Sequence, residues 1–119
     1  MIKKILLSSA IIASPLAASA ATLKCTVNEA GDMDKVRVYV RCNEAAVDGT
    51  SNVNIFALPY GTTVDEKAKT ARFFALTQTA LATGAPLLLT FTTGTAGTNS
   101  SIYCTDYCRI ADGFKLTAK

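Results

Sequence analysis

Four cysteines are the feature that most constrains what this chain of 119 residues can fold into. They are Cys25, Cys42, Cys104 and Cys108. In a small exported protein, four cysteines indicate two disulfides, for which three pairings are possible. A zinc site is the rival interpretation, but the chain has no histidine and the first two cysteines are 17 residues apart, so disulfides are favoured.

The first 20 residues, MIKKILLSSAIIASPLAASA, have the pattern of a secretory signal peptide. Two lysines precede a short apolar segment from Ile5 to Leu16, and small residues at 18–20 provide a cleavage site. We expect cleavage after Ala20. A retained membrane anchor is the minor alternative, because the apolar segment is too short to span a membrane as a stable helix. The mature chain, residues 21–119, is therefore predicted to be a single domain that is secreted or periplasmic, without membrane association.

The segment from Thr22 to Cys42 is patterned as a strand, a turn and a second strand. A turn with Met33 and Asp34 at its tip places Cys25 opposite Cys42, at about the 5.5 Å Cα separation of a disulfide. We therefore predict that these two cysteines pair, and by elimination that Cys104 pairs with Cys108. One face of this hairpin would carry Leu23, Cys25, Val27, Val36, Val38, Val40 and Cys42, with Val27 opposite Val40 and Glu29 opposite Val38.

One helix is predicted with defined ends. Thr63 and Glu66 have the spacing of a capping box, so the helix should run from Val64 to about Thr83 and end at Gly84. Its second half is apolar or small on nearly every side and is expected to be buried. The small residues expected to lie against a sheet are Ala68, Ala71, Ala75 and Ala82, flanked by Phe73, Phe74, Leu76 and Leu81.

Three further strands complete the expected fold. Residues 43–52 are rich in turn formers, 53–60 form a third strand, and 85–93 form a fourth strand whose three leucines suggest cover on both faces. A fifth strand follows Gly113. The class is therefore mainly β with one helix (α+β). The order of hairpin, strand, helix, strand and strand matches an OB-fold, a small five-stranded barrel with a helix between strands three and four.

Several of these segments together resemble a toxin family. They are the disulfide-spanned hairpin, the helix AKTARFFALTQTALATG, the strand APLLLTF and the closely spaced C-terminal cysteine pair. From roughly Cys25 to Cys108 the chain resembles the B subunits of pertussis-type and subtilase-cytotoxin-type toxins. The resemblance implies a secreted OB-fold protein that forms a homo-oligomer, a ring of five, and binds cell-surface glycans. The sialic-acid contacts that subtilase-type subunits place before the first cysteine cannot be transferred, because only residues 21–24 precede Cys25.

The charge and residue types favour a non-catalytic binding module. Without Lys3 and Lys4, ten basic residues remain against nine acidic ones, and no basic stripe suggests a nucleic-acid partner. No histidine is present to act as a general base, so we expect no enzyme activity and no cofactor. The acidic residues of NEAGDMDK lack EF-hand spacing, so no metal is expected. A periplasmic partner-binding or inhibitor protein is the alternative, and a small hydrolase is a third class.

Candidate ligand-binding residues lie at alternate positions on the second hairpin strand. Arg37, Tyr39 and Arg41 should point away from the valines, opposite Thr26 and Asn28. A tyrosine ring can stack on the apolar face of a sugar, and an arginine can hold a carboxylate with two hydrogen bonds. An ordinary solvated strand face has the same composition, so both interpretations stay open. A second candidate cluster is Tyr60, Tyr103 and Tyr107.

Overall fold

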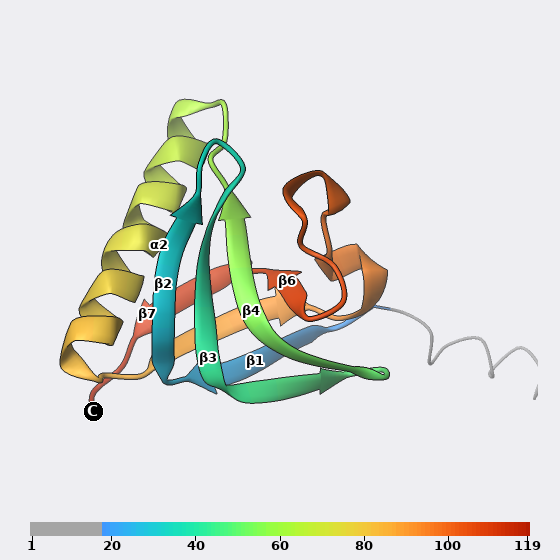
Figure 1. The fold of residues 1–119 in the computed structure, drawn as a ribbon, viewed down its shortest axis with the longest axis horizontal. Helices are drawn as coiled ribbons and strands as arrows, with labels where there is room; N and C mark the ends of the chain where they lie inside the picture. The colour runs from blue at the N-terminus through green and yellow to red at the C-terminus, as the bar shows by residue number, and fades with distance from the viewer. Residues whose placement is uncertain (1–17) are drawn as a thin grey trace, which may run out of the picture.

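The computed structural model describes residues 18–119 (Figure 1), so most of the predicted signal peptide lies outside the described residues. The described chain forms seven strands, one α-helix and two short 3-10 helices. The strands are β1 (Ala20–Cys25), β2 (Val27–Met33), β3 (Arg37–Asp48), β4 (Ser51–Pro59), β5 (Leu87–Thr92), β6 (Cys108–Ile110) and β7 (Gly113–Leu116). The helices are α2 (Val64–Thr83), η2 (Gly94–Gly97) and η3 (Ser100–Ile102).

The strands are arranged in two sheets (Figure 1). One has the order β1-β5-β7 and is antiparallel, and the other has the order β2-β3-β4-β6, in which β4 and β6 run parallel. The predicted class, mainly β with one helix, is confirmed. Within residues 18–119 the sheets form no closed barrel, and seven strands replace the expected five.

Two bends carry the chain from one sheet to the other. Thr26 alone separates β1 from β2, and its carbonyl accepts a hydrogen bond of 2.9 Å from the Asn43 amide. The Glu44 carboxylate secures this bend by accepting hydrogen bonds from the Thr26 amide and hydroxyl, at 2.6 and 2.7 Å. At the second bend, Ala111 donates its amide to β4 and Asp112 donates its amide to β5. The expected hairpin strand is therefore two strands in different sheets.

The structure contains both predicted disulfides, but the register from which the first was predicted is wrong. Cys25 ends β1 opposite Leu87 of β5, while Val27 lies opposite Cys42. The β2–β3 turn spans three residues, 34–36, rather than the expected Met33 and Asp34, and a bulge follows Val27. The Cys25–Cys42 disulfide, with a Cα separation of 5.2 Å, therefore joins the two sheets rather than two strands of one hairpin.

The main core lies between the sheets and under the helix. Val38, Val40 and Cys42 face into it, as predicted from their alternation. A second, smaller cluster lies on the opposite face of the β2-β3-β4-β6 sheet, where the segment after β5 folds over the strands. Its buried members are Ala57, Ile102, Cys104 and Cys108, and its half-buried members are Val36, Tyr39, Ile55 and Ile110. The outer face of β3 is therefore partly covered.

The helix α2 has the predicted bounds. The Thr63 side chain accepts from the Glu66 amide in a complete capping box, and Gly84 ends the helix in the left-handed conformation at φ 77°. The predicted buried face is wrong, because the four alanines expected to lie against a sheet are exposed. The buried residues are Thr70, Phe73, Thr77 and Ala80. Within the described residues, no helix is both long enough and apolar enough to cross a membrane.

Two threonines occupy the buried helix face because their hydroxyls bond to nearby carbonyls. Thr70 Oγ1 donates to the Pro59 carbonyl at 2.8 Å, and Thr77 Oγ1 donates to the Phe74 carbonyl at 2.9 Å. Burying a hydroxyl that has a hydrogen-bond partner costs little free energy, so threonines are tolerated at these positions. The buried residues form a narrow stripe along the helix. The apolar residues beside that stripe stay open to solvent, including Phe74 at 38% exposed.

The remaining strands differ from expectation in three places. Residues 43–52 were expected to be a loop, but β3 continues to Asp48 and β4 begins at Ser51, which leaves a two-residue turn. The short β6 was not predicted. On β5, Leu87 and Leu89 are buried while Leu88 is half-buried, so one face is covered much more than the other.

Candidate functional site

The three predicted ligand-binding residues share the outer face of β3, but Arg37 is only 8% exposed. Its Nη1 donates to the Tyr103 carbonyl at 2.9 Å, and its guanidinium lies 5.1 Å from the centre of the Tyr39 ring. Burial lowers the pKa of this guanidinium. The expectation of a solvated Arg37 is therefore wrong, because the loop after η3 lies over it. Arg41 remains exposed.

Glu29 links the other two residues. Tyr39 Oη donates to Glu29 Oε2 at 2.6 Å, and Arg41 Nη1 lies 3.3 Å from Glu29 Oε1. The hydrogen bond to Glu29, followed by burial, raises the pKa of Tyr39. The register places Gly31 opposite Tyr39, and a Cβ on this glycine would lie 3.2 Å from the tyrosine hydroxyl. The expected neighbours, Thr26 and Asn28, are not the register partners of these residues.

A hollow of about 360 Å³ lies beside Arg41 on the outer face. Its lining residues are Arg41, Ala45, Asn52, Asn54, Ile55 and Tyr107. The Tyr107 carbonyl accepts hydrogen bonds from the amides of Asn54 and Ile55, at 3.2 and 3.1 Å, which fixes this residue against β4. Its side chain is 63% exposed. A guanidinium, two side-chain amides and an aromatic ring therefore surround one small space.

The three tyrosines expected as a second cluster divide between two places. Tyr107 lies within the loop closed by the Cys104–Cys108 disulfide and Tyr103 directly precedes that loop, whereas Tyr60 lines a cavity beside α2. The loop has an unusual backbone, because Tyr103 and Asp106 both have positive φ, at 57° and 30°. Only Tyr107 of the three lines the hollow beside Arg41.

The two asparagines of the hollow were not predicted as ligand-binding residues from the sequence. Asn52 falls in the segment expected to be a loop, and Asn54 falls on the third expected strand. Asn54 is a polar residue beside the buried Val53, which was a weak signal for a polar outer face. No pattern in the sequence indicated that Arg41 lies near Tyr107, because this proximity depends on the position of the disulfide loop in the folded protein.

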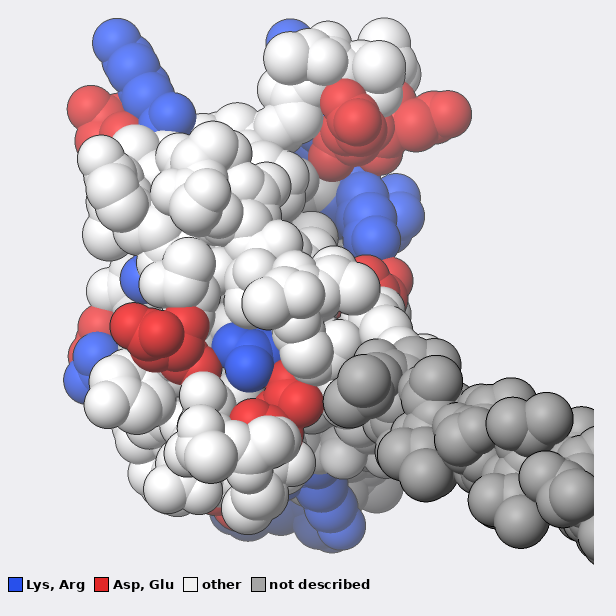
Figure 2. Space-filling model, turned by 90° about the vertical axis from the view of Figure 1, so that its right-hand side faces the viewer, with Lys and Arg blue, Asp and Glu red and all other residues white. Residues whose placement is uncertain are grey.

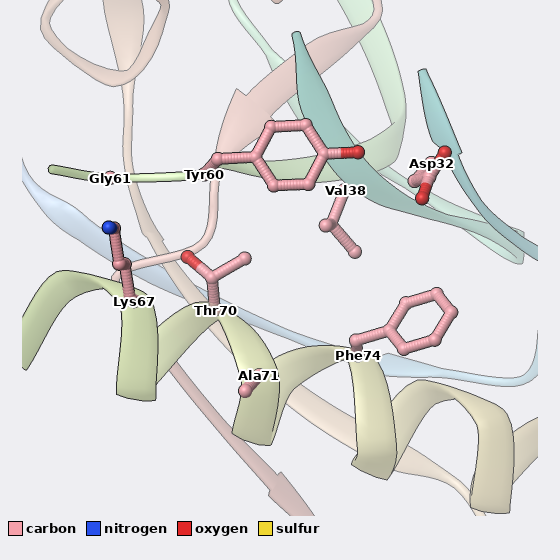
Figure 3. A pocket seen from close by; sticks show the side chains of 8 residues that line it. All are labelled: Asp32, Val38, Tyr60, Gly61, Lys67, Thr70, Ala71 and Phe74. Carbon is pink, nitrogen blue, oxygen red and sulfur yellow. The ribbon is translucent and has the colours of Figure 1, made fainter. Parts of the chain in front are cut away.

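A second cavity, of about 340 Å³, lies between α2 and the β2–β3 hairpin (Figure 3). Its lining residues are Asp32, Val38, Tyr60, Gly61, Lys67, Thr70, Ala71 and Phe74. Burial raises the pKa of the Tyr60 hydroxyl, and the nearby Asp32 carboxylate raises it further. At this end of the cavity the Tyr60 hydroxyl therefore lies close to the Asp32 side chain.

Charged side chains are mixed rather than gathered on the face that carries the β3–β4 turn and the disulfide loop. Figure 2 shows acidic and basic groups interspersed among uncharged ones on the described part of this face. In residues 18–119, no three His, Cys, Asp or Glu side chains lie where they could jointly hold a metal ion.

Comparison with known proteins finds no matching family model and no curated protein with significant similarity. The two cavities and their side chains are therefore the basis for inferring what the protein binds.

Proposed function

We propose that the mature chain is an exported, disulfide-stabilised binding module that recognises a glycan in the hollow beside Arg41. The carrying observation is that Arg41, Asn54 and Tyr107 line one space. Side-chain amides and guanidinium groups bind sugar hydroxyls and carboxylates, while an exposed aromatic ring covers the apolar face of a pyranose. A sugar with a carboxylate fits best, because Arg41 is the charged group of the hollow.

Export is supported by the two disulfides. All four cysteines in the described chain are paired, and such bonds persist in oxidising compartments such as the periplasm and the extracellular space. The N-terminal pattern of lysines, an apolar segment and small residues adds independent support. Both observations favour a secreted or periplasmic location.

The proposal includes an OB-type architecture and the likeness to toxin B subunits. Its support is the antiparallel pairing of β1 with β5, the parallel pairing of β4 with β6, and the position of α2 between β4 and β5. The bend at Thr26 places β1 and β2 in different sheets, and the bend at Ala111 does the same for β6 and β7. Assembly into a ring is part of this proposal, and sedimentation of the mature protein tests it.

A glycan array tests the proposed ligand, with titration of any bound glycan to obtain affinity. We expect Tyr107→Ala to lower the affinity at least about fivefold, because an aromatic contact contributes about 1 kcal/mol beyond the area it buries. Asn54→Ala should weaken binding as well, since it removes an amide of the hollow.

Tyr103→Ala is the matched control. Tyr103 directly precedes the disulfide loop and is 69% exposed but does not line the hollow, so its removal should leave glycan affinity unchanged. Equal losses for the two tyrosine variants would place the ligand elsewhere on the loop. Failure of the unmodified mature protein to bind any glycan would overturn the proposal.

A partner-binding or inhibitory protein is the second candidate, favoured by the two exposed tyrosines on one constrained loop. Exposed tyrosines are enriched where proteins bind other proteins. In this case Tyr103→Ala and Tyr107→Ala should both weaken association with the protein partner, while glycan binding is absent. The same pair of variants therefore separates the two candidate functions.

A further inference from the structure

The cavity between α2 and the β2–β3 hairpin has apolar walls built from both elements. Ala71 and Phe74 contribute from the helix, and Val38 contributes from β3. Thr70 uses its hydroxyl to bond the Pro59 carbonyl, so that donor is already satisfied. Figure 3 shows the Tyr60 ring on one side of the cavity and Phe74, carried by the helix, on the opposite side. Two aromatic rings and small side chains therefore frame the space.

The two ends of this cavity carry opposite charges. Figure 3 shows the Tyr60 hydroxyl directed toward the end where Asp32 lies, with Lys67 at the other end. Asp32 is exposed, and no ion pair within residues 18–119 includes it. Asp34 adds a second negative charge near the Tyr60 hydroxyl. Both carboxylates come from the β2–β3 hairpin, so this end is suited to a cation.

We propose that this cavity binds an apolar ring that carries a protonated amine, with the ring between Tyr60 and Phe74 and the amine at Asp32. The ammonium group donates to the carboxylate and lies near the electron-rich Tyr60 ring, which also attracts cations. A volume of about 340 Å³ is at the lower end of ligand pockets, which span roughly 300–1,000 Å³, so a small ligand or one terminal residue of a peptide fills it.

This site is separate from the proposed glycan site. Val38 points into the core side of β3 and lines the amine cavity, whereas Arg41 points to the outer face. Loss of binding at one site therefore does not require loss at the other, and the two proposals fail independently.

Titration of the isotope-labelled mature protein with 2-phenylethylamine tests the inference by NMR. We expect saturable shifts of the amides of Asp32, Thr70 and Ala71, with a dissociation constant of about 1 to 10 mM for so small a probe. The neutral 2-phenylethanol should bind about tenfold more weakly, since a charge-assisted hydrogen bond is lost. The acid 3-phenylpropionate should cause no saturable shift at Asp32.

A paired substitution on the helix provides the control. Ala71→Leu fills the cavity from an exposed helix position and should abolish amine binding without unfolding the protein. Ala75→Leu makes the same change one turn along, outside the lining residues, and should leave binding intact. Asp32→Asn should reduce amine affinity to that of the alcohol. Melting curves of all three variants verify that they fold.

Two probes distinguish the sources of this chemistry. Phenylalanyl-glycine amide carries the same ring and amine at a peptide N-terminus. If it binds more tightly than 2-phenylethylamine, the natural ligand is a peptide N-terminus. If it binds more weakly, the natural ligand is a free amine. Either result supports the site. Tighter binding of 3-phenylpropionate than of the amine, no saturable shift with any probe, or equal effects of the two leucine variants would overturn it.

Discussion

Arg109 Nε lies 2.8 Å from Asp48 Oδ2, with both side chains less than a tenth exposed. Asp48 also accepts the Gly94 amide at 2.7 Å, and Arg109 donates to the carbonyls of Asp106 and Cys108 at 3.1 and 2.7 Å. This pair joins the end of β3, the start of η2 and the disulfide loop. It therefore holds the end of β3 against residues that lie 46 and 61 positions further along the chain.

Asp48→Asn should lower the free energy of unfolding by about 3 to 5 kcal/mol, because it leaves the buried Arg109 charge without a counter-charge. Urea unfolding followed by circular dichroism measures the change. Glu29→Gln alters the exposed pair with Arg41 and should cost about 1 kcal/mol or less. A similar small loss for both variants would show that the buried pair contributes no more than the exposed one.

Stability should decline in acid, because three carboxylates have lowered pKa values. Glu66 has a pKa of about 2, since it accepts hydrogen bonds from the amides of Thr62 and Thr63. At Glu44 and Asp48, burial opposes ionisation, but hydrogen bonds from Thr26 to Glu44 and from Arg109 to Asp48 outweigh it and lower the pKa.

A carboxylate with a lowered folded-state pKa stabilises the protein fully above its unfolded pKa, about 4, and this contribution is lost as the pH falls through the folded value. The free energy of unfolding should therefore be level near neutral pH and fall from about pH 4 toward pH 2. Urea titrations across this range measure it. Glu66→Gln should make the decline shallower, and a profile unchanged by acid would contradict the assignment.

The Cys25–Cys42 disulfide should contribute more to global stability than the Cys104–Cys108 disulfide. The first closes a loop of 17 residues between the two sheets, and replacing both of its cysteines by alanine should cost about 3 kcal/mol. Replacing the second pair should cost less but should weaken glycan binding, because it frees the loop that positions Tyr107. Thiol titration of the denatured, unreduced protein should find no reactive cysteine.

Arg37 should stabilise the protein mainly by packing beneath the disulfide loop. Its Nε has no hydrogen-bond partner among the described residues, so its charge is incompletely satisfied. Arg37→Ala should cost about 2 kcal/mol, since it leaves a cavity and removes the bond to the Tyr103 carbonyl. Arg37→Met restores the apolar stem and should recover about half of this loss. Full loss in the methionine variant, measured by urea unfolding, would show that the charge is essential.

The bounds of the helix α2 could be predicted from the sequence because its ends depend on local chemistry. The Thr63 capping box and the left-handed Gly84 each involve residues within four positions of one another. The buried helix face was predicted wrongly, because hydroxyl bonds inside the fold allow Thr70 and Thr77 to be buried while the small alanines face solvent.

The candidate ligand sites were only partly predictable. The outward alternation of Arg37, Tyr39 and Arg41 was visible in the sequence, and all three lie on the outer face of β3. The sequence did not indicate which of the three is exposed to solvent, because residues 102–108 fold back over β3 and cover Arg37. Their role in ligand binding stays a prediction.

By itself, the sequence determined the strand alternation, the bounds of α2 and the residues available for two disulfides, because each follows from neighbours along the chain or from composition. Only the tertiary structure decided that Cys25 and Cys42 join two sheets, that β6 pairs in parallel with β4, and that Tyr107 lies beside Arg41. These relationships depend on a one-residue bend at Thr26 and on contacts between segments more than 50 residues apart. The free energy of such contacts comes from packing between distant segments, so no pattern of neighbouring residues indicates it.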